Sequence, residues 1–237
     1  MDDRALKELE LLAVTRLYRS VDVTPGASRN LDVTPGAAIA AMDGGPISHA
    51  AASAGWDELR ALVAACRACG LCKQRKQAVF GVGAESGPWL FVGEGPGADE
   101  DEQGEPFVGQ AGRLLDNMLA AIGCRRGQDT YIANVVKCRP PGNRTPTAEE
   151  AAACAPFLDR QIELIAPKLI VALGKSAIVR LLATEASVAS LRGKVHRYRG
   201  IPVVVTYHPA YLLRSLPEKA KAWEDLLFAR RTLRGIG

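Results

Sequence analysis

Four apolar runs of strand length, each leading into a polar loop, constrain the fold of this chain most strongly. The runs cover residues 89–92, 131–136, 168–173 and 203–206. Helical patterns lie between and after them, over residues 111–122, 147–165, 176–182 and 217–233. Strands that alternate with helices are typical of a parallel sheet covered by helices on both faces. The sequence therefore predicts an α/β fold, a three-layer α/β/α sandwich around a four-stranded parallel sheet.

Composition narrows the class of protein further. Hydrophobic residues make up 48% and charged residues 24% of the 237 positions, which is ordinary for a soluble globular protein. No apolar run reaches the roughly 18 residues of a membrane span, and Met1-Asp2-Asp3 does not begin a secretory signal. We therefore expect a cytoplasmic protein. Its net charge of +4 is compatible with a nucleic-acid partner but argues only weakly for one.

Two regions of different composition divide the chain. Residues 1–20 have helical periodicity, and the following stretch repeats Val-Asp-Val-Thr-Pro-Gly-Ala as Leu-Asp-Val-Thr-Pro-Gly-Ala in a region rich in Gly, Pro, Ala and Ser. Such a composition is typical of a flexible linker, because it offers few large apolar side chains to bury. The sequence predicts an N-terminal helix and linker over residues 1–55 and one folded domain over residues 56–237. Removing residues 1–55 is expected to change neither stability nor activity.

Three polar loops follow the predicted strands. The first is glycine-rich and acidic, over residues 93–101 and 104–109; the others cover residues 134–141 and 207–214. The carboxyl ends of parallel strands share one edge of the sheet, and ligands bind at that edge in open α/β folds. Glycines let the backbone approach a flat ligand or a phosphate, and carboxylates can position water. By itself the first loop is equally compatible with a tight turn carrying solvated acids.

The six cysteines indicate metal chemistry, since disulfides are rare in a reducing compartment. Cys66 and Cys69 have Cys-x-x-Cys spacing, and Cys138 and Cys154 form a second pair. Four thiolates suit structural zinc or a [4Fe–4S] cluster, and a redox Cys-x-x-Cys is a further option. Cys72 extends the first run to a ferredoxin-like half-motif, which favours iron–sulfur. Cys124 is expected to be a small buried hydrophobic residue.

The motifs together carry a family resemblance. They are Gly93-Glu94-Gly95-Pro96-Gly97 with Pro106-Phe107-Val108-Gly109, Asn134-Val135-Val136-Lys137-Cys138-Arg139-Pro140-Pro141, and His208-Pro209-Ala210-Tyr211-Leu212-Leu213-Arg214. In order and spacing the chain from about residue 66 to 227 resembles the family 4 uracil-DNA glycosylases, the iron–sulfur members of their superfamily. The resemblance implies a four-stranded parallel sheet and excision of uracil from DNA in base-excision repair. It places the [4Fe–4S] ligands at Cys66, Cys69, Cys138 and Cys154, with Cys72 a spare.

The resemblance also implies how a flipped uracil would be held. His208 would donate a hydrogen bond to uracil O2, where negative charge builds as the glycosidic bond breaks. Asn134 would match N3–H and O4 and mismatch the amino group of cytosine. Phe107 would stack on the ring, and backbone N–H groups near Gly95 would bind uracil oxygens. The structural alternatives are a His-Pro turn, an Asx turn and core packing.

Acids and DNA contacts complete the expected site. Glu94 and Glu100 are the candidates for positioning water, whereas Asp101 is expected to be solvated. Leu212 and Leu213 resemble a wedge that fills the gap left by the base, although they equally fit the first turn of a buried helix. The residues expected to grip phosphates are Lys137, Arg139, Arg144 and Arg214.

Other functions remain open at this level. An iron–sulfur electron carrier would leave Asn134, Phe107 and His208 unexplained. A relative that traps uracil covalently would need a histidine in an inserted loop, and none occurs between Lys137 and Val195. The alternative retained is an iron–sulfur, DNA-binding accessory protein associated with a polymerase, without turnover. We expect a monomer, with the N-terminal helix as the candidate contact for a protein partner and uracil-containing DNA as the substrate.

Overall fold

The computed structural model describes residues 46–236 and centres on a six-stranded sheet of order β1-β3-β2-β4-β6-β5. β3, β2, β4 and β6 pair in parallel, whereas β1 and β5 are antiparallel edge strands. The strands are β1 Val82–Gly83, β2 Trp89–Gly93, β3 Thr130–Asn134, β4 Leu169–Leu173, β5 Val195–Tyr198 and β6 Ile201–Thr206. The predicted four-stranded parallel sheet is thus confirmed as the centre of a larger one. The edge strands escaped prediction because β1 has two residues and β5 has no apolar run.

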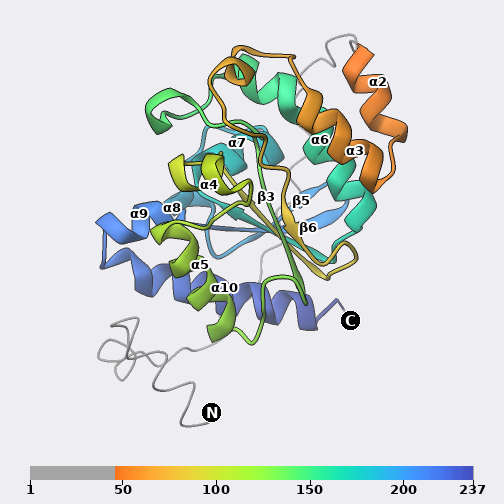
Figure 1. Ribbon diagram of the computed structural model, residues 1–237. Helices are drawn as coiled ribbons and strands as arrows, with labels where there is room; N and C mark the ends of the chain where they lie inside the picture. The colour runs from red at the N-terminus through yellow and green to blue at the C-terminus, as the bar shows by residue number, and fades with distance from the viewer. Residues whose placement is uncertain (1–45, 237) are drawn as a thin grey trace, which may run out of the picture.

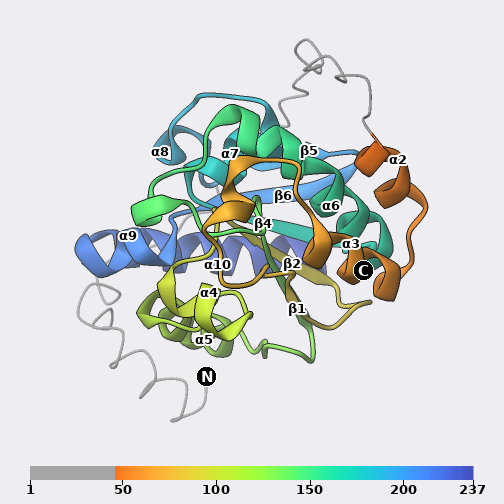
Figure 2. The ribbon, with the colours of Figure 1, turned by 45° about the horizontal axis from the view of Figure 1, so that its top comes forward.

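Helices cover both faces of the sheet, as a three-layer sandwich requires (Figure 1). Alternate residues of each strand point to opposite faces. Leu90 and Val92 pack with α3, α6 and α7, whereas Phe91 packs with α5, α9 and α10. These helices are α3 Trp56–Ala65, α5 Gln110–Ala121, α6 Ala148–Ile165, α7 Lys175–Leu182, α9 Pro209–Arg214 and α10 Glu218–Arg234. The same separation of the two layers is visible after rotation (Figure 2).

The predicted helix boundaries agree with the structure to within about one residue, and local capping explains the best case. At the start of α6 the Glu150 N–H donates to Thr147 Oγ1 at 3.3 Å, and the Thr147 N–H donates to Glu150 Oε2 at 2.9 Å. This reciprocal pair is the capping box that the sequence predicts. Ala166, in the left-handed region with φ 47°, ends the helix.

Short helices were the elements that sequence patterns missed. They include α4 Ala98–Gln103, in the loop expected to be irregular and acidic, and α8 Val188–Leu191. Two 3₁₀ turns, η2 Gly70–Lys73 and η3 Pro141–Asn143, lie next to cysteines 69 and 138. No helix in the described part of the chain is long and apolar enough to cross a membrane.

The folded body begins before residue 56, which corrects the expected domain boundary. Residues 46–53 form α2 Pro46–Ser53, where the sequence predicted linker. Ala51 and Ala54 have 0% exposure and belong to the same core as α6. Arg160 of α6 donates from Nε to the Ala54 carbonyl at 2.8 Å. The helix expected over residues 1–20 lies outside the described residues.

Comparing two truncations tests the role of α2. A chain that begins at residue 56 should be less stable than one that begins at residue 46, because it loses two fully buried alanines and the bond from Arg160. Burial of two methyl groups stabilises by about 1.6 kcal/mol. For a domain of this size that corresponds to a melting temperature roughly 3–6 °C lower. If the two truncated chains melt at the same temperature in a thermal scan, α2 does not stabilise the domain.

Candidate active site

Three side chains expected to hold a base converge at the carboxyl edge of the sheet. Asn134 ends β3 directly opposite Gly93 of β2. A Cβ atom on Gly93 would lie 2.5 Å from both Asn134 Oδ1 and Phe107 Cζ, so only glycine leaves room for these two side chains. The rings of Phe107 and His208 are 5.4 Å apart between centroids. Gly174, which follows β4 and has φ 82°, also passes close to His208, because a Cβ atom added to this glycine would lie 2.9 Å from the His208 Cβ.

His208 is held as a neutral hydrogen-bond donor. It precedes α9, and its Nδ1 accepts the Ala210 N–H at 3.2 Å. In a neutral ring this assigns the proton to Nε2. Burial, together with the nearby positive charge of Arg214, lowers the pKa of His208 to about 4. Nε2 is itself buried and has no partner among the described residues, so an N–H donor faces the site unused.

Asn134 presents a second unpaired atom. Its side chain is 2% exposed, and Oδ1 is buried with no hydrogen-bond partner in the described part of the protein. Buried polar atoms are almost always paired, so an unpaired acceptor and an unpaired donor on two residues that both neighbour Phe107 call for a ligand. The His208 Nε2 and Asn134 Oδ1 atoms therefore mark the two polar walls of the site.

Phe107 is fixed by its backbone. It has φ 57°, an uncommon conformation for a bulky residue. Arg126, which the sequence analysis did not single out, donates from Nη1 to the Pro106 carbonyl and from Nη2 to the Phe107 carbonyl, both at 2.8 Å. A Cβ atom on Gly112 would overlap the Phe107 carbonyl, which explains a glycine inside α5. The ring is thereby held, 5% exposed, next to His208.

The acids of the first loop have three different environments. Glu94 is partly buried, and its Oε2 accepts a hydrogen bond from Ser176 Oγ of α7. Glu100 binds backbone N–H groups with both oxygens: Oε2 accepts from Gly97, and Oε1 accepts from Val108 and Gly109. The structure therefore makes Glu100 a loop cap and leaves Glu94 as the acid available for water. Asp101, expected to be solvated, is 3% exposed.

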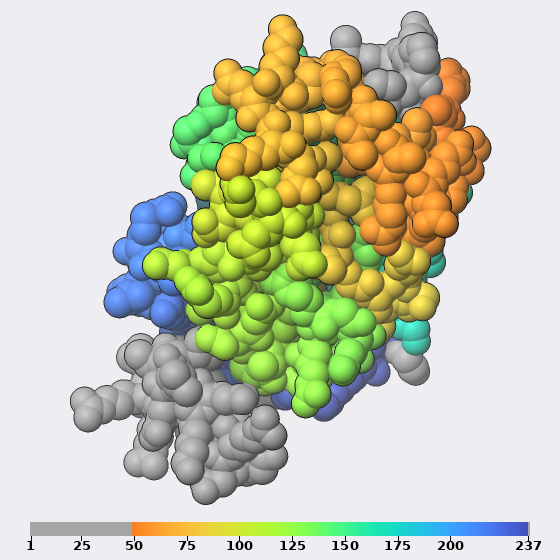
Figure 3. All heavy atoms as spheres, viewed as in Figure 1, coloured from red at the N-terminus to blue at the C-terminus, as the bar shows by residue number. Residues whose placement is uncertain are grey.

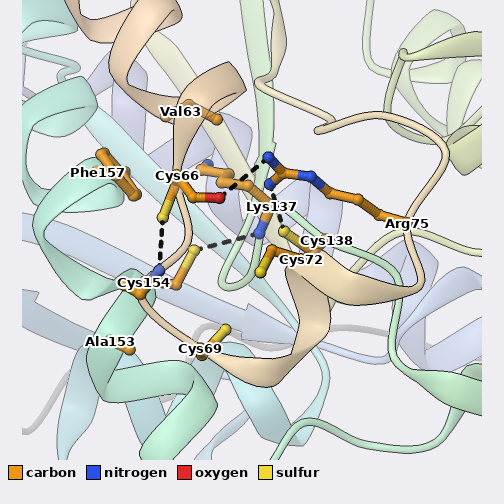
Figure 4. Close-up of a pocket in the computed structure, with 11 residues that line it drawn as sticks. Val63, Cys66, Cys69, Cys72, Arg75, Lys137, Cys138, Ala153, Cys154 and Phe157 are labelled. Atoms are coloured by element: carbon orange, nitrogen blue, oxygen red, sulfur yellow. Dashed lines mark hydrogen bonds between the residues drawn. The ribbon is translucent and has the colours of Figure 1, made fainter.

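Five cysteines line one pocket beside α3, η2 and α6, and their sulfur atoms face a shared space (Figure 4). They are Cys66, Cys69, Cys72, Cys138 and Cys154. Cys124 is buried in the other core, as expected. No three cysteine, histidine or acidic side chains of the described residues gather closely enough for a single metal ion.

Hydrogen bonds to sulfur separate three of the expected ligands from Cys72. The Ala68 N–H lies 3.5 Å from Cys66 Sγ, and the Lys137 N–H lies 3.3 Å from Cys154 Sγ. Arg75 Nη1 donates to Cys138 Sγ at 2.9 Å. Donors of this kind favour the thiolate, which is the form that binds metal. Within the described residues Cys72 Sγ receives no such bond.

Residues 80–227 match the family model described as the uracil DNA glycosylase superfamily. The chain belongs to this superfamily. It is 47% identical over 165 residues to the Type-4 uracil-DNA glycosylase of Archaeoglobus fulgidus, covering 66% of this chain and 82% of that protein. The corresponding values are 50% over 152 residues for the Thermotoga maritima Type-4 enzyme, with coverage of 63% and 79%. For the Pyrobaculum aerophilum Type-4 enzyme they are 45% over 177 residues, with coverage of 71% and 90%.

In this member of the superfamily, two of the residues expected to contact DNA are buried. Lys137 is 1% exposed, and its ammonium group binds the Asn134 carbonyl at 3.0 Å and Gln161 Oε1 at 2.6 Å. It supports the end of β3 and cannot reach a phosphate. Leu212 is 1% exposed and packs in the core with α5 and α10. Both predicted DNA contacts are therefore wrong.

The remaining candidates lie at the surface of the glycosylase fold. Leu213 is 38% and Leu216 is 61% exposed, and Arg214 between them is also exposed. The blue segment that contains α9 projects at the left edge of the space-filling view (Figure 3). Arg139 is half-buried and donates to Asn143 Oδ1 at 2.7 Å, whereas Arg144 is committed to an ion pair with Glu150.

Proposed function

We propose that this protein flips uracil out of DNA and hydrolyses its N-glycosidic bond, leaving an abasic site. The observation that carries the proposal is the pairing of an unused donor, His208 Nε2, with an unused acceptor, Asn134 Oδ1, beside the Phe107 ring. A planar base with carbonyl and N–H groups on its edge would satisfy both. The names of the relatives, Type-4 uracil-DNA glycosylase, agree with this assignment.

His208 would serve the step in which the bond between N1 and C1′ breaks. Negative charge then develops on the uracil oxygens, while the sugar acquires oxocarbenium character. A neutral Nε2–H donor aimed at O2 strengthens its hydrogen bond as that charge grows and requires no proton transfer. The lowered pKa keeps the ring neutral across the physiological range.

Asn134 would read the base. Its carbonyl oxygen accepts N3–H of uracil and its amide N–H donates to O4, whereas cytosine has an acceptor at N3 and an amino group at C4. The Lys137 ammonium, bonded to the Asn134 carbonyl, holds the backbone that carries this side chain. Phe107 would stack on the ring, and the backbone near Gly95 lies where further N–H groups would meet the base. Discrimination against cytosine thus follows from the donor and acceptor order.

Glu94 would position the attacking water. Its carboxylate is oriented by the hydroxyl of Ser176, which leaves Oε1 for a water on the sugar side of the base. A carboxylate also stabilises the positive charge that develops on the sugar. On the DNA side, Leu213 would fill the gap left by the flipped base, with Arg214 and Arg139 near phosphates.

The cysteine pocket fits a [4Fe–4S] cluster on Cys66, Cys69, Cys138 and Cys154. When bound, the group would cross-link segments that are far apart in sequence and stabilise the fold. The residues themselves join α3 and its following turn to the segment after β3 and to α6. No chemical step of base excision requires the cluster in this proposal.

Cysteine substitutions test the ligand assignment. Purified protein should be brown with broad visible absorbance. Cys72→Ala should keep that absorbance, since the resemblance places the four ligands at Cys66, Cys69, Cys138 and Cys154 and leaves Cys72 a spare. Cys66→Ala and Cys154→Ala should lose most of it. Iron analysis and the visible spectrum measure both. A colourless protein with stoichiometric zinc, or a Cys72 variant that loses its colour, would contradict the assignment.

The activity is tested directly with oligonucleotides. Purified protein is incubated with a uracil-containing strand and with a matched thymine-containing strand, and alkali then cleaves any abasic site. Cleavage of the uracil strand alone is expected. Tight binding of the uracil strand without cleavage would instead support the accessory-protein alternative.

A further inference from the structure

Arg75 links the two halves of the cysteine pocket (Figure 4). Its Nη1 donates to Cys138 Sγ at 2.9 Å, while Nη2 donates to the Ala64 carbonyl at 2.6 Å and to the Cys66 carbonyl at 3.2 Å. One planar guanidinium thereby joins the end of α3 and the segment that carries Cys66 to the segment that carries Cys138. Arg67 makes a useful contrast, because it binds the carbonyls of residues 65 and 66 but no sulfur.

The two residues that follow Arg75 bind α4. The Lys76 N–H donates to Asp101 Oδ1 at 3.0 Å, and Gln77 Nε2 donates to the Glu102 carbonyl at 2.6 Å. Asp101 is 3% exposed, so its bond to Lys76 is shielded from competing water. Removing a buried acceptor of this kind leaves the donor unpaired. The chain from 75 to 77 therefore contacts the cysteine pocket at one end and α4 at the other.

The same helix organises the loop that carries Phe107. Glu100, adjacent to Asp101, accepts the N–H groups of Gly97 at 2.9 Å, Val108 at 2.9 Å and Gly109 at 3.1 Å. Val108 follows Phe107, whose ring lies beside His208. A path thus runs from the thiol of Cys138 to the aromatic wall of the base site, in which hydrogen bonds alternate with covalent links between neighbouring residues of the chain.

We propose that residues 75–77 and α4 couple the cysteine pocket to the base site, with Arg75 and Asp101 as positioning residues for Phe107. The proposal rests on the proposed function for the identity of the base site. Without Arg75 or Asp101, α4 and the loop from 104 to 109 gain freedom, and Phe107 spends less time in the stacking position. The cysteine pocket then influences catalysis without taking part in any bond-making step.

Asp101 variants test the base-site end. Asp101→Ala should lower the single-turnover excision rate roughly 10-fold to 100-fold, because small displacements of positioning groups have effects of that size. The dissociation constant for DNA and the visible spectrum should change by less than about twofold, since Asp101 touches neither expected ligands nor the DNA surface. Asp101→Asn keeps an acceptor for the Lys76 N–H and should restore most of the rate. Gln103→Ala is the matched control, because that α4 side chain is exposed and makes no hydrogen bond to the described residues, so the variant should behave as the parent.

Arg75 variants test the pocket end by a readout independent of activity. In protein purified with its cluster, Arg75→Gln should lose its visible absorbance about 10-fold faster than the parent when a chelator is added. An effect of this size is common when a hydrogen bond to a metal ligand is removed. Amide hydrogen exchange in residues 104–109 should also rise above the parental rate, although Arg75 touches none of them. Arg67→Gln should change neither quantity.

Clear outcomes would overturn the coupling. Parental exchange in residues 104–109 for both Arg75→Gln and Asp101→Ala would refute it, even if uracil excision is confirmed. An Asp101→Asn variant as slow as Asp101→Ala would refute the role given to the Lys76 N–H. Should the parent fail to excise uracil, the exchange measurements still decide the coupling by themselves, so the two proposals fail separately.

Discussion

Replacing His208 by alanine should slow uracil release by roughly 10²–10³-fold in single-turnover experiments, a loss of about 2.7–4 kcal/mol of transition-state stabilisation. The reason is geometric: Nδ1 is occupied by the Ala210 N–H, so Nε2 is the donor, and no described residue uses it. Its hydrogen bond to O2 matters most when the base becomes anionic, so DNA binding should change little. Single-turnover kinetics with enzyme in saturating excess over DNA separate the rate of the chemical step from the affinity for DNA.

The pH dependence of the parent provides an independent check on His208. With a pKa of about 4, the ring stays neutral down to acidic pH, and no loss of rate near pH 6.5 should come from its protonation. In the unfolded chain the histidine takes up its proton near pH 6.5. Its contribution to stability is therefore complete above pH 6.5 and lost as pH falls towards 4.

The His208→Ala variant would contradict the proposed role if it excised uracil at the parental single-turnover rate once DNA is bound. The stabilisation of the leaving group would then belong to backbone donors near Gly95.

The central sheet and long helices could be predicted because their signals are local. Each parallel strand is a short apolar run buried on both faces, and the capping box of Thr147 and Glu150 marks the start of α6. Edge strands lack such a signal, since β5 alternates exposed and half-buried residues. Helix α4 was mistaken for a solvated loop because its acids find partners outside the helix, such as Lys76 for Asp101 and Val108 for Glu100.

Within the site, the type of a residue predicted its chemical role more reliably than it predicted whether the side chain is buried. Asn134, Phe107 and His208 are brought together at one edge of the sheet, as strand order implies. Lys137 was assigned to the DNA surface because a lysine in a polar, basic loop is usually exposed. Its acceptor Gln161 lies 24 residues later in the sequence, in α6, and the sequence gives no sign of that contact. For Leu212 and Leu213 the orientation of α9 decides the exposure. Neighbouring helical positions point about 100° apart, which here places Leu212 against the core and Leu213 towards solvent.

Replacing Asn134 by aspartate should impair excision more than any other isosteric change in the site. The variant keeps the size of the side chain but loses the amide N–H that would donate to O4. It also places a carboxylate, 2% exposed at this position, beside a base that becomes negatively charged in the transition state. Both effects act in the same direction, and we expect the rate to fall by at least about 10³-fold, the upper end for one lost donor.

Asn134→Ala serves as the control that separates the two effects. The alanine variant lacks the donor but adds no charge, so its rate should lie between those of the parent and Asn134→Asp. The aspartate form should recover part of its rate at acidic pH, where protonation of the carboxyl restores a donor and removes the charge. Single-turnover rates on uracil-containing and cytosine-containing strands, from pH 4.5 to 8, measure this. Because His208 is largely neutral above about pH 5, a rise in the Asn134→Asp rate between pH 8 and pH 5 would belong to the new carboxyl group. An aspartate variant no slower than the alanine variant at pH 8 would mean that Asn134 contacts the base without meeting its developing charge.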